Sequence, residues 1–207
     1  MNKNKKPVAL VTGASSGIGL VTAQKLVAAG YRVFGTSRRP GADMQHSFEM
    51  LPLDVDKDES VAALVNQIID STGRIDLLVN NAGLSPLYPS LYEVTEDLYS
   101  KVMDVNLKGP FRLSAAFGKR MFDSEGGSII NVSSVAAIEP TPNETAYGAA
   151  KAGVHAITKS FAREYGPKVR VNCIMPGPFL TDISKAWDME VFNAKAETDI
   201  ALRRGGE

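Results

Sequence analysis

The stretch that most restricts the fold lies near the N-terminus, where an apolar run passes directly into a glycine-rich turn. Val8–Val11 has the length of a buried strand, the turn TGASSGIG occupies residues 12–19, and a helical stretch continues to Ala29. A strand, a tight turn and a helix in immediate succession form the first unit of a doubly wound parallel sheet. Because unpaired N–H groups at a helix N-terminus favour an anion, we expect this turn to bind phosphate.

The glycines of this turn have separate expected roles. Gly13 permits the tight turn, Gly17 allows the backbone to approach a pyrophosphate, and Gly19 allows the helix to pack close to the strand. The spacing G-x3-G-x-G departs from the common G-x-G-x-x-G fingerprint, so an ordinary strand-to-helix turn stays an alternative. The expected cofactor contacts in the turn are Gly13, Ser15, Ser16, Gly17, Ile18 and Gly19.

Further apolar segments of strand length alternate with helical stretches along the chain. Several of the segments are apolar on both faces, which is typical of a parallel sheet covered by helices on both sides. With right-handed crossovers, this alternation predicts an α/β fold, a Rossmann-type doubly wound sheet of six strands in a single domain over residues 1–207. The other expected strands are 32–35, 50–53, 75–79, 128–132 and 169–174, and the expected helices are 18–29, 59–69, 98–122 and 146–165.

Composition excludes several classes of function. Lys plus Arg and Asp plus Glu each number 23, and this balance does not require a surface that binds polyanions and argues against nucleic acid as the main partner. No apolar window approaches the roughly 18 residues that span a bilayer, so no membrane partner is expected. The single Cys173 cannot form an intrachain disulfide, which fits a reducing, cytoplasmic location. His46 and His155 lack the spacing of metal ligands, so we expect no metal site.

The end of the second expected strand indicates which dinucleotide the protein prefers. In an NAD site, an acid near this point binds the ribose hydroxyls, but the sequence here is Thr36-Ser37-Arg38-Arg39. The guanidinium of Arg38, with Arg39 beside it, suits a 2′-phosphate. We therefore predict that NADP(H) is preferred over NAD(H), with a solvated pair of arginines as the alternative.

An ordered set of motifs carries a resemblance to a known family. The motifs are TGASSGIG at 12–19, NNAG at 80–83, NLKG at 106–109, NVSS at 131–134, YGAAK at 147–151 and PG at 176–177. Together, over nearly the whole chain, they resemble the short-chain dehydrogenase/reductase family, and in particular NADP-preferring members of the 3-oxoacyl-carrier-protein reductase type. The resemblance implies a nicotinamide cofactor and hydride transfer between that cofactor and a small carbonyl or alcohol substrate.

Tyr147 and Lys151 stand four residues apart on an expected helix, so their side chains share one face. A neighbouring ammonium favours the phenolate, and we therefore expect Lys151 to lower the pKa of Tyr147. The resemblance implies that Tyr147 donates a proton to the carbonyl oxygen during reduction, or removes one in reverse. It also implies that Lys151 binds the nicotinamide ribose.

Two more catalytic residues are implied by the resemblance. Ser134, thirteen residues before Tyr147, would donate a hydrogen bond to the substrate oxygen, with Ser133 as the competing serine. Asn106 would hold a water linked to Lys151. Taken singly, each of these residues also suits a structural role. Tyr147 could serve packing, Lys151 could be a solvated helix residue, Ser134 a helix cap and Asn106 a buried hydrogen-bonding amide. Their joint occurrence with the glycine-rich turn favours the catalytic interpretation.

Three further segments complete the expected cofactor site. The resemblance directs the Asp54 carboxylate at the adenine amino group, although an Asp before a helix is also a common cap. It places small residues after the fourth strand against the adenosine, and the loop after the sixth strand over the nicotinamide, where Thr181 would bind the carboxamide. These segments contribute Asp54, Val55, Asn81, Ala82, Gly83, Pro176, Gly177, Phe179 and Thr181.

Apolar side chains gather in the loops on the expected substrate side, which favours a moderately apolar carbonyl or alcohol. Loop packing is the alternative for all of them. The loop after the expected strand 169–174 belongs to a lid segment that we place at about 177–200. The residues are Leu84, Pro86, Leu87, Tyr88, Tyr92, Ile138, Pro140, Phe179 and Trp187.

The resemblance implies one more helix and a seventh strand after 202–207, where this sequence stops. We therefore expect strand 169–174 to lie at an edge of the sheet with unpaired backbone groups. Family tetramers use that further region for one contact and the helices around 100–122 and 146–165 for the other. We expect a homodimer more readily than a tetramer. The hypothesis is an NADP-dependent oxidoreductase without a metal; the alternatives are a dinucleotide-binding protein without turnover and a partly folded fragment.

Overall fold

The fold is built on one parallel β-sheet. The computed structural model describes residues 6–39, 46–181, 184 and 187–207. Six strands pair in the order β3-β2-β1-β4-β5-β6, all parallel, which confirms the expected doubly wound sheet. The strands are β1 (Val8–Val11), β2 (Arg32–Ser37), β3 (Glu49–Pro52), β4 (Leu77–Asn80), β5 (Gly127–Val132) and β6 (Val169–Ile174).

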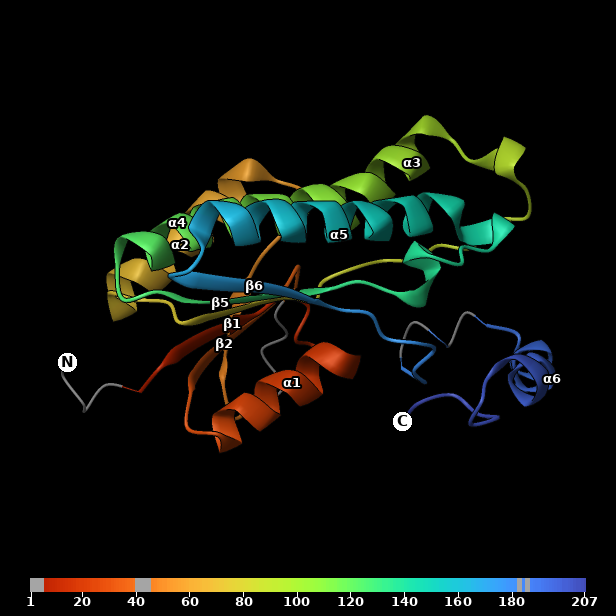
Figure 1. Ribbon diagram of the computed structural model, residues 1–207, viewed down its shortest axis with the longest axis horizontal. Coiled ribbons are helices and arrows are strands. Elements are labelled where there is room, and N and C mark those ends of the chain that lie inside the picture. The colour runs from red at the N-terminus through yellow and green to blue at the C-terminus, as the bar shows by residue number, and fades with distance from the viewer. Residues whose placement is uncertain (1–5, 40–45, 182–183, 185–186) are drawn as a thin grey trace.

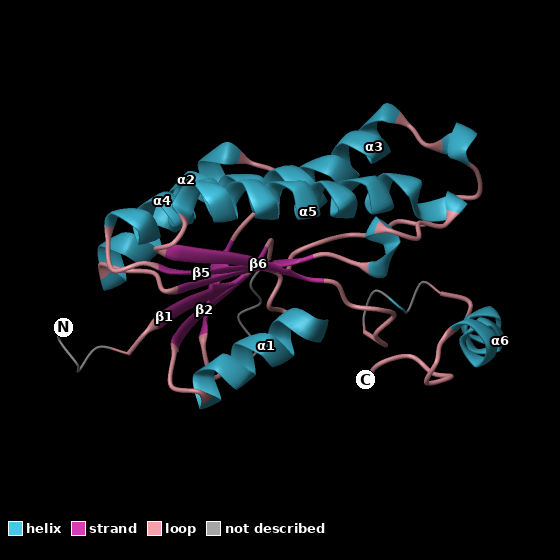
Figure 2. Cartoon of the chain, in the orientation of Figure 1, coloured by secondary structure: helices cyan, strands magenta, loops and turns pink. Residues whose placement is uncertain are grey.

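Helices cover both faces of the sheet, as expected. Helix α1 lies on one face, and α2, α4 and α5 lie together on the other, with α3 beyond the carboxyl ends of the strands (Figure 1, Figure 2). Because β1 pairs with both β2 and β4, the strand order reverses direction there, at the place where such sheets bind their ligands. The helices are α1 (Gly17–Ala28), α2 (Asp58–Thr72), α3 (Glu96–Met103), α4 (Gly109–Asp123), α5 (Thr145–Tyr165) and α6 (Met189–Asp199).

The run Val8–Val11 is apolar throughout because both faces of β1 are covered. Leu10 packs in the larger core between the sheet and α2, α4 and α5, together with Leu78, Ile129 and Phe117. Its neighbours Ala9 and Val11 point the other way, into the smaller core under α1. All of these side chains are essentially inaccessible to solvent, and each large one contributes about 1.5–3 kcal/mol of transfer free energy.

The expected helix 98–122 is wrong as a single element. Thr95 caps α3 by accepting a hydrogen bond from the backbone N–H of Leu98, at 3.2 Å. The helix then passes at Asp104–Lys108 into one π-helical turn before α4 begins. Pro110, at the start of α4, has no N–H to donate to a preceding carbonyl, which accounts for a break at this point.

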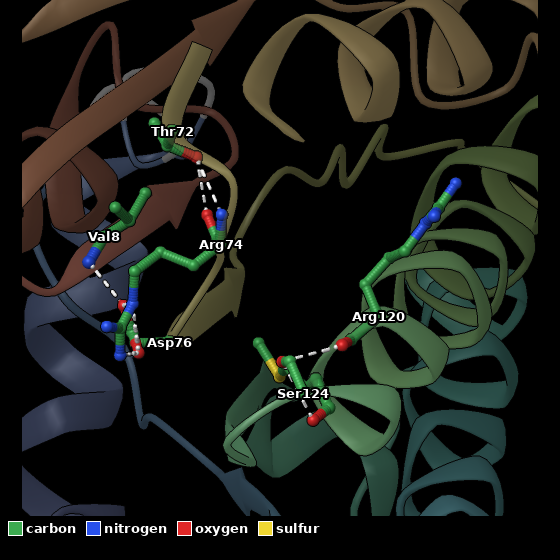
Figure 3. Close-up of polar contacts among 7 residues, drawn as sticks. Val8, Thr72, Arg74, Asp76, Arg120 and Ser124 are labelled. Atoms are coloured by element: carbon green, nitrogen blue, oxygen red, sulfur yellow. Dashed lines mark hydrogen bonds and ion pairs between the residues drawn. The ribbon is translucent and has the colours of Figure 1, made fainter. Parts of the chain in front are cut away.

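The ends of the sheet remote from the glycine-rich turn are held by polar contacts (Figure 3). Asp76, just before β4, accepts a hydrogen bond from the backbone N–H of Val8 at 2.7 Å and forms an ion pair with Arg74. Thr72, the last residue of α2, bonds to the backbone of Arg74. These contacts join the amino ends of β1 and β4, and leave their carboxyl ends to the loops that carry chemistry.

The C-terminal segment is the part of the fold that the sequence did not predict in detail. Helix α6 falls within the expected lid at 177–200, and Asp188 caps it by accepting from the backbone N–H groups of Glu190 and Val191. Gly206 then pairs with the segment after β6, through bonds with Pro178 and Leu180. Among the described residues no strand pairs with the outer edge of β6, as expected. None of the described helices combines the length and the apolar character needed to cross a membrane.

Candidate active site

The glycine-rich turn has the geometry that its sequence predicts. Gly13 and Gly17 adopt left-handed backbone conformations, with φ of +65° and +53°. A Cβ at Gly19 would lie 2.2 Å from the carbonyl oxygen of Gly13, so only glycine allows α1 to approach β1 this closely. Ser16 precedes α1 in an extended conformation without a side-chain cap. The first N–H groups of α1 are therefore left for a ligand at this turn.

A cavity of about 340 Å³ lies over this turn. It is formed where the loops after β1, β2, β3 and β4 meet at the carboxyl edge of the sheet. Of the six expected cofactor contacts in the turn, Gly19 alone lies outside the cavity wall, because it packs between α1 and β1 instead. The expected residues that line the cavity are Gly13, Ser15, Ser16, Gly17, Ile18, Arg38, Asp54, Val55, Asn81, Ala82, Gly83 and Thr181.

The donors and acceptors in this cavity fit a dinucleotide. Oδ1 of Asp54 and Oγ of Ser37 are buried and have no hydrogen-bond partner within the described residues. Buried polar atoms are usually paired, so two such atoms in one cavity wall fit a ligand that carries an amino group and hydroxyl or phosphate oxygens. The sequence did not identify Ser37. The signal that points to it is its place directly before Arg38, at the end of β2.

The loop after β4 is fixed against the turn by Thr12. The Thr12 hydroxyl accepts hydrogen bonds from the backbone N–H groups of Asn81 and Ala82, both at 2.9 Å. In return the side-chain amide of Asn81 donates to the carbonyl of Thr12, also at 2.9 Å. The small residues of the NNAG motif are thus held at the point where the strand order reverses.

A second cavity, of about 200 Å³, adjoins the first. Ile18, Asn81, Gly83 and Thr181 line both, so the two form one continuous depression. The expected residues in the second wall are Ser134, Tyr147, Lys151, Pro176, Gly177, Phe179 and Trp187. The sequence did not identify Glu144, which also lines this cavity and which stands three residues before Tyr147.

The pKa of Tyr147 shifts in the direction opposite to the one expected. Burial raises the pKa of Tyr147, the neighbouring Ser134 hydroxyl works in the opposite direction, and the negative charge of Glu144 raises the pKa further. The net shift is upward. The expected lowering by Lys151 was wrong for the protein without ligand, because spacing along a helix gives proximity and does not give the degree of burial.

Lys151 lies beside the Tyr147 ring and is held there by a backbone contact. Its Nζ donates a hydrogen bond to the carbonyl of Val132 at 2.8 Å and lies 5.6 Å from the centroid of the Tyr147 ring. The ammonium thus sits over the ring and is held by the end of β5. The side chain is only 3% exposed, and burial lowers the pKa of Lys151 to about 8, although the nearby Cys173 partly offsets this.

The structure separates the two candidate serines. The hydroxyl of Ser133 is buried and donates to the backbone carbonyl of Lys151 at 3.0 Å. Ser134 is partly exposed in the cavity wall, where its hydroxyl accepts a bond from the N–H of Ala136 and keeps its own proton to donate. This arrangement favours Ser134 as the serine that faces a substrate.

Asn106 lies in the π-helical turn, and its side chain is fully bonded to protein. Its Oδ1 accepts from the N–H of Leu84 at 3.2 Å, and its Nδ2 donates to the carbonyls of Leu84 and Val102. The side chain therefore fixes the loop after β4 that borders both cavities. The expected water link between Asn106 and Lys151 stays a prediction.

The expected substrate-side residues divide into three groups. Phe179 and Trp187 line the second cavity, and Leu84 lines the first. Tyr88 was wrongly assigned to this side, because it is buried and its hydroxyl accepts from the N–H of Ala146 at 3.2 Å. The remaining expected residues lie outside both cavity walls: Pro86, Leu87, Tyr92, Ile138 and Pro140. Within the described residues, no cluster of three His, Cys, Asp or Glu side chains is suited to a metal ion.

Comparison with known proteins agrees with this fold. The family model of the short-chain dehydrogenases matches residues 7–191. The 3-oxoacyl-[acyl-carrier-protein] reductase FabG of Vibrio cholerae is 40% identical over 190 residues, covering 88% of this chain and 78% of the relative. A 3alpha-hydroxysteroid dehydrogenase of Mediterraneibacter gnavus is 35% identical over 219 aligned residues, covering 100% and 86%.

Among solved structures, the crystal structure of a 3-oxoacyl-[acyl-carrier protein] reductase from Brucella melitensis in complex with NAD is similar over 99% of this chain and 86% of that one. Its TM-score is 0.90 at 28% identity. The match of the family model to most of the chain, together with the identity to the Vibrio protein, assigns the class. This chain belongs to the short-chain dehydrogenase/reductase family of oxidoreductases.

Proposed function

We propose that this protein is an NADP(H)-dependent reductase of a small, moderately apolar carbonyl compound, with Tyr147 as the proton donor. One observation carries the proposal: Ser134, Tyr147 and Lys151 line a single cavity that opens into the glycine-lined cavity of the nucleotide site. When bound, the nicotinamide supplies the hydride. The chain itself supplies orientation, a proton and electrostatic stabilisation.

The side chains of the site suit the roles that carbonyl reduction requires. Burial and Glu144 raise the pKa of Tyr147, so the phenol carries its proton near neutral pH, as a proton donor to a carbonyl oxygen must. Ser134 donates a hydrogen bond to the same oxygen and holds it in place. The Lys151 ammonium over the ring stabilises the phenolate that remains after the proton has left.

The nucleotide site supports the assignment of the cofactor to named residues. The N–H groups after Gly17 would hold the pyrophosphate, Asp54 the adenine amino group, and the segment of Phe179 and Thr181 the nicotinamide. Arg38, which lines the first cavity, would bind the 2′-phosphate. We also propose a homodimer formed through α4 and α5, because two phenylalanines of α4, Phe111 and Phe122, are exposed.

Replacement of Tyr147 by Phe tests the proposal. The variant keeps the ring and its packing but loses the proton donor, so turnover should fall by about 10²–10⁴-fold while NADPH affinity is unchanged. The measurement is NADPH oxidation against a panel of ketones and aldehydes, with fluorescence titration of NADPH binding. Tyr92→Phe is the matched control, because Tyr92 is fully exposed outside both cavities. Undiminished turnover by Tyr147→Phe would contradict the mechanism.

A further inference from the structure

Glu144 brings a negative charge to the wall of the catalytic cavity. It lines the same cavity as Ser134, Tyr147 and Lys151, and its side chain is half-buried. It stands directly before α5, three residues ahead of Tyr147. Side chains three residues apart at the start of a helix lie on the same side, so the acid and the phenol are neighbours.

The carboxylate of Glu144 has no structural partner that would explain its place. Acids at this position commonly cap the following helix, but Glu144 makes no side-chain capping bond to α5. Asp188, in the same position before α6, does cap its helix. Within the described parts of the chain, the Glu144 carboxylate forms neither an ion pair nor a hydrogen bond.

The rest of the cavity wall offers little that would neutralise this charge. Among the described lining residues, the only other charged side chain is Lys151. Its ammonium is engaged by the carbonyl of Val132 and lies near Gly83, at the side of the cavity toward the nucleotide site. The wall on the substrate side is apolar, with Ala136, Pro178 and Phe179 among its members.

The field of this carboxylate reaches the reacting group. Together with burial, the negative charge of Glu144 raises the pKa of Tyr147, and both residues line the same cavity. A neutral substrate would leave this charge uncompensated in a partly desolvated cavity. A substrate with a cationic group would pair with it and would also relieve its effect on the phenol.

We propose that Glu144 selects carbonyl substrates that carry a cationic group, namely an ammonium, on the side of the reacting carbon that faces the start of α5. This inference rests on the proposed function, because it assigns a substrate class to the same cavity. Glu144 thus acts as a specificity residue, while Ser134 and Tyr147 act on the carbonyl oxygen whatever the substrate carries.

A pair of ketones of the same shape tests the inference. The probes are 5-(trimethylammonio)pentan-2-one and its uncharged carbon analogue 6,6-dimethylheptan-2-one, whose charge difference does not depend on pH. With NADPH bound, the native protein should reduce the ammonium ketone with a kcat/KM about tenfold higher, a moderate value for one partly solvated charge pair. Glu144→Gln should abolish this preference, mainly by lowering kcat/KM for the ammonium ketone.

The control and a second readout separate this inference from the proposed function. Glu139→Gln removes a negative charge from an exposed residue outside the cavity and should leave the ratio unchanged. Calorimetric binding of both ketones to Tyr147→Phe with NADPH measures the same preference without turnover. Equal binding of the two ketones, or a preference that survives Glu144→Gln, overturns the inference. Reduction of both ketones in that case still upholds the proposed function. An ammonium preference in binding without any reduction upholds the inference and contradicts the function.

Discussion

The predicted preference for NADPH over NADH depends on one side chain, that of Arg38. It stands directly after β2 and lines the first cavity, whereas its neighbour Arg39, which is exposed like Arg38, lies outside the cavity wall. Arg38→Ala should weaken NADPH binding by about tenfold or more, because an arginine–phosphate pair is a charge-assisted, often bidentate contact. NADH binding should change little, since NADH lacks the 2′-phosphate.

Dissociation constants of both dinucleotides, measured by fluorescence titration, check this prediction. Arg39→Ala is the matched control, because it removes the same charge one residue away without touching the cavity. Equal losses for NADPH and NADH in Arg38→Ala would show that the arginine does not read the 2′-phosphate.

Residues linked by local spacing could be predicted from the sequence alone, and residues of distant loops could be predicted through the family resemblance. Properties that depend on burial could not be predicted. The glycines of the turn and the pair Tyr147 and Lys151 follow from the geometry of one turn or one helix. The upward shift of the Tyr147 pKa depends on burial by elements distant in sequence. For the same reason Ser37 was not identified, since its importance lies in a buried hydroxyl without a partner.

The loop between β3 and α2 is positioned by two other helices. Lys101 of α3 forms an ion pair with Asp56, whose side chain is only 6% exposed, and Arg112 of α4 donates to the Asp56 carbonyl at 3.0 Å. This loop carries Asp54 and Val55 into the nucleotide cavity. Burial acts to raise the pKa of Asp56, but its bonds to Lys101 and Asp54 and the charge of Lys101 outweigh burial, and the pKa is lowered.

The ion pair predicts a pH dependence of stability with a definite sign. Because the folded pKa of Asp56 lies below its unfolded value of about 3.9, the stabilisation is complete above that value and is lost as the pH falls through the folded pKa. Asp56→Asn should lower the free energy of unfolding at pH 7 by about 1–3 kcal/mol, since it leaves Lys101 without its partner.

Urea unfolding at neutral pH and at about pH 3 checks this prediction. The difference between Asp56→Asn and the native chain should shrink at the lower pH, because the carboxyl of the unfolded chain takes up a proton there and favours the unfolded state. Asp70→Asn, an exposed change on α2, is the control and should have little effect at either pH. A difference of constant size would indicate that Asp56 acts through packing and not through its charge.

At the level of elements, the strands were predicted better than the helices. Every expected strand is present within a residue or two, because apolar runs between polar turns are confined by the two covering layers. The stretch 98–122 has a continuous helical pattern, yet one π-helical turn divides it. The pattern does not reveal this turn, because it depends on Pro110 and on the bonds of Asn106 to the loop after β4.

The whole molecule has one face that suits a second copy. On the outer side of α4, Phe111 is 49% exposed and Phe122 39% exposed, and Phe111 packs against Phe161 of α5. A groove of about 610 Å³ runs along α2 and α4 beside Phe111. Apolar patches of this kind mark association surfaces. We predict a homodimer of twice the chain mass of 22.2 kDa, in which α4 and α5 form the contact.

Light scattering after size-exclusion chromatography measures that mass. Phe111→Asp should shift the protein to a monomer, because the partner would then bury an unpaired charge. Val21→Asp places the same charge at a similarly exposed apolar position on α1, on the opposite face of the sheet, and should leave the dimer intact. A native chain that is monomeric at every concentration would rule out this interface.

The bonds between Gly206 and the segment after β6 give the last residues of the chain an unexpected influence. They hold Pro178 and Leu180 through backbone bonds of 2.9 and 2.8 Å, and Pro178 lines the cavity that also contains Tyr147. An affinity tag fused behind Glu207 would therefore disturb that cavity wall. The start of β1, by contrast, lies at the opposite end of the strands, away from that cavity wall (Figure 1).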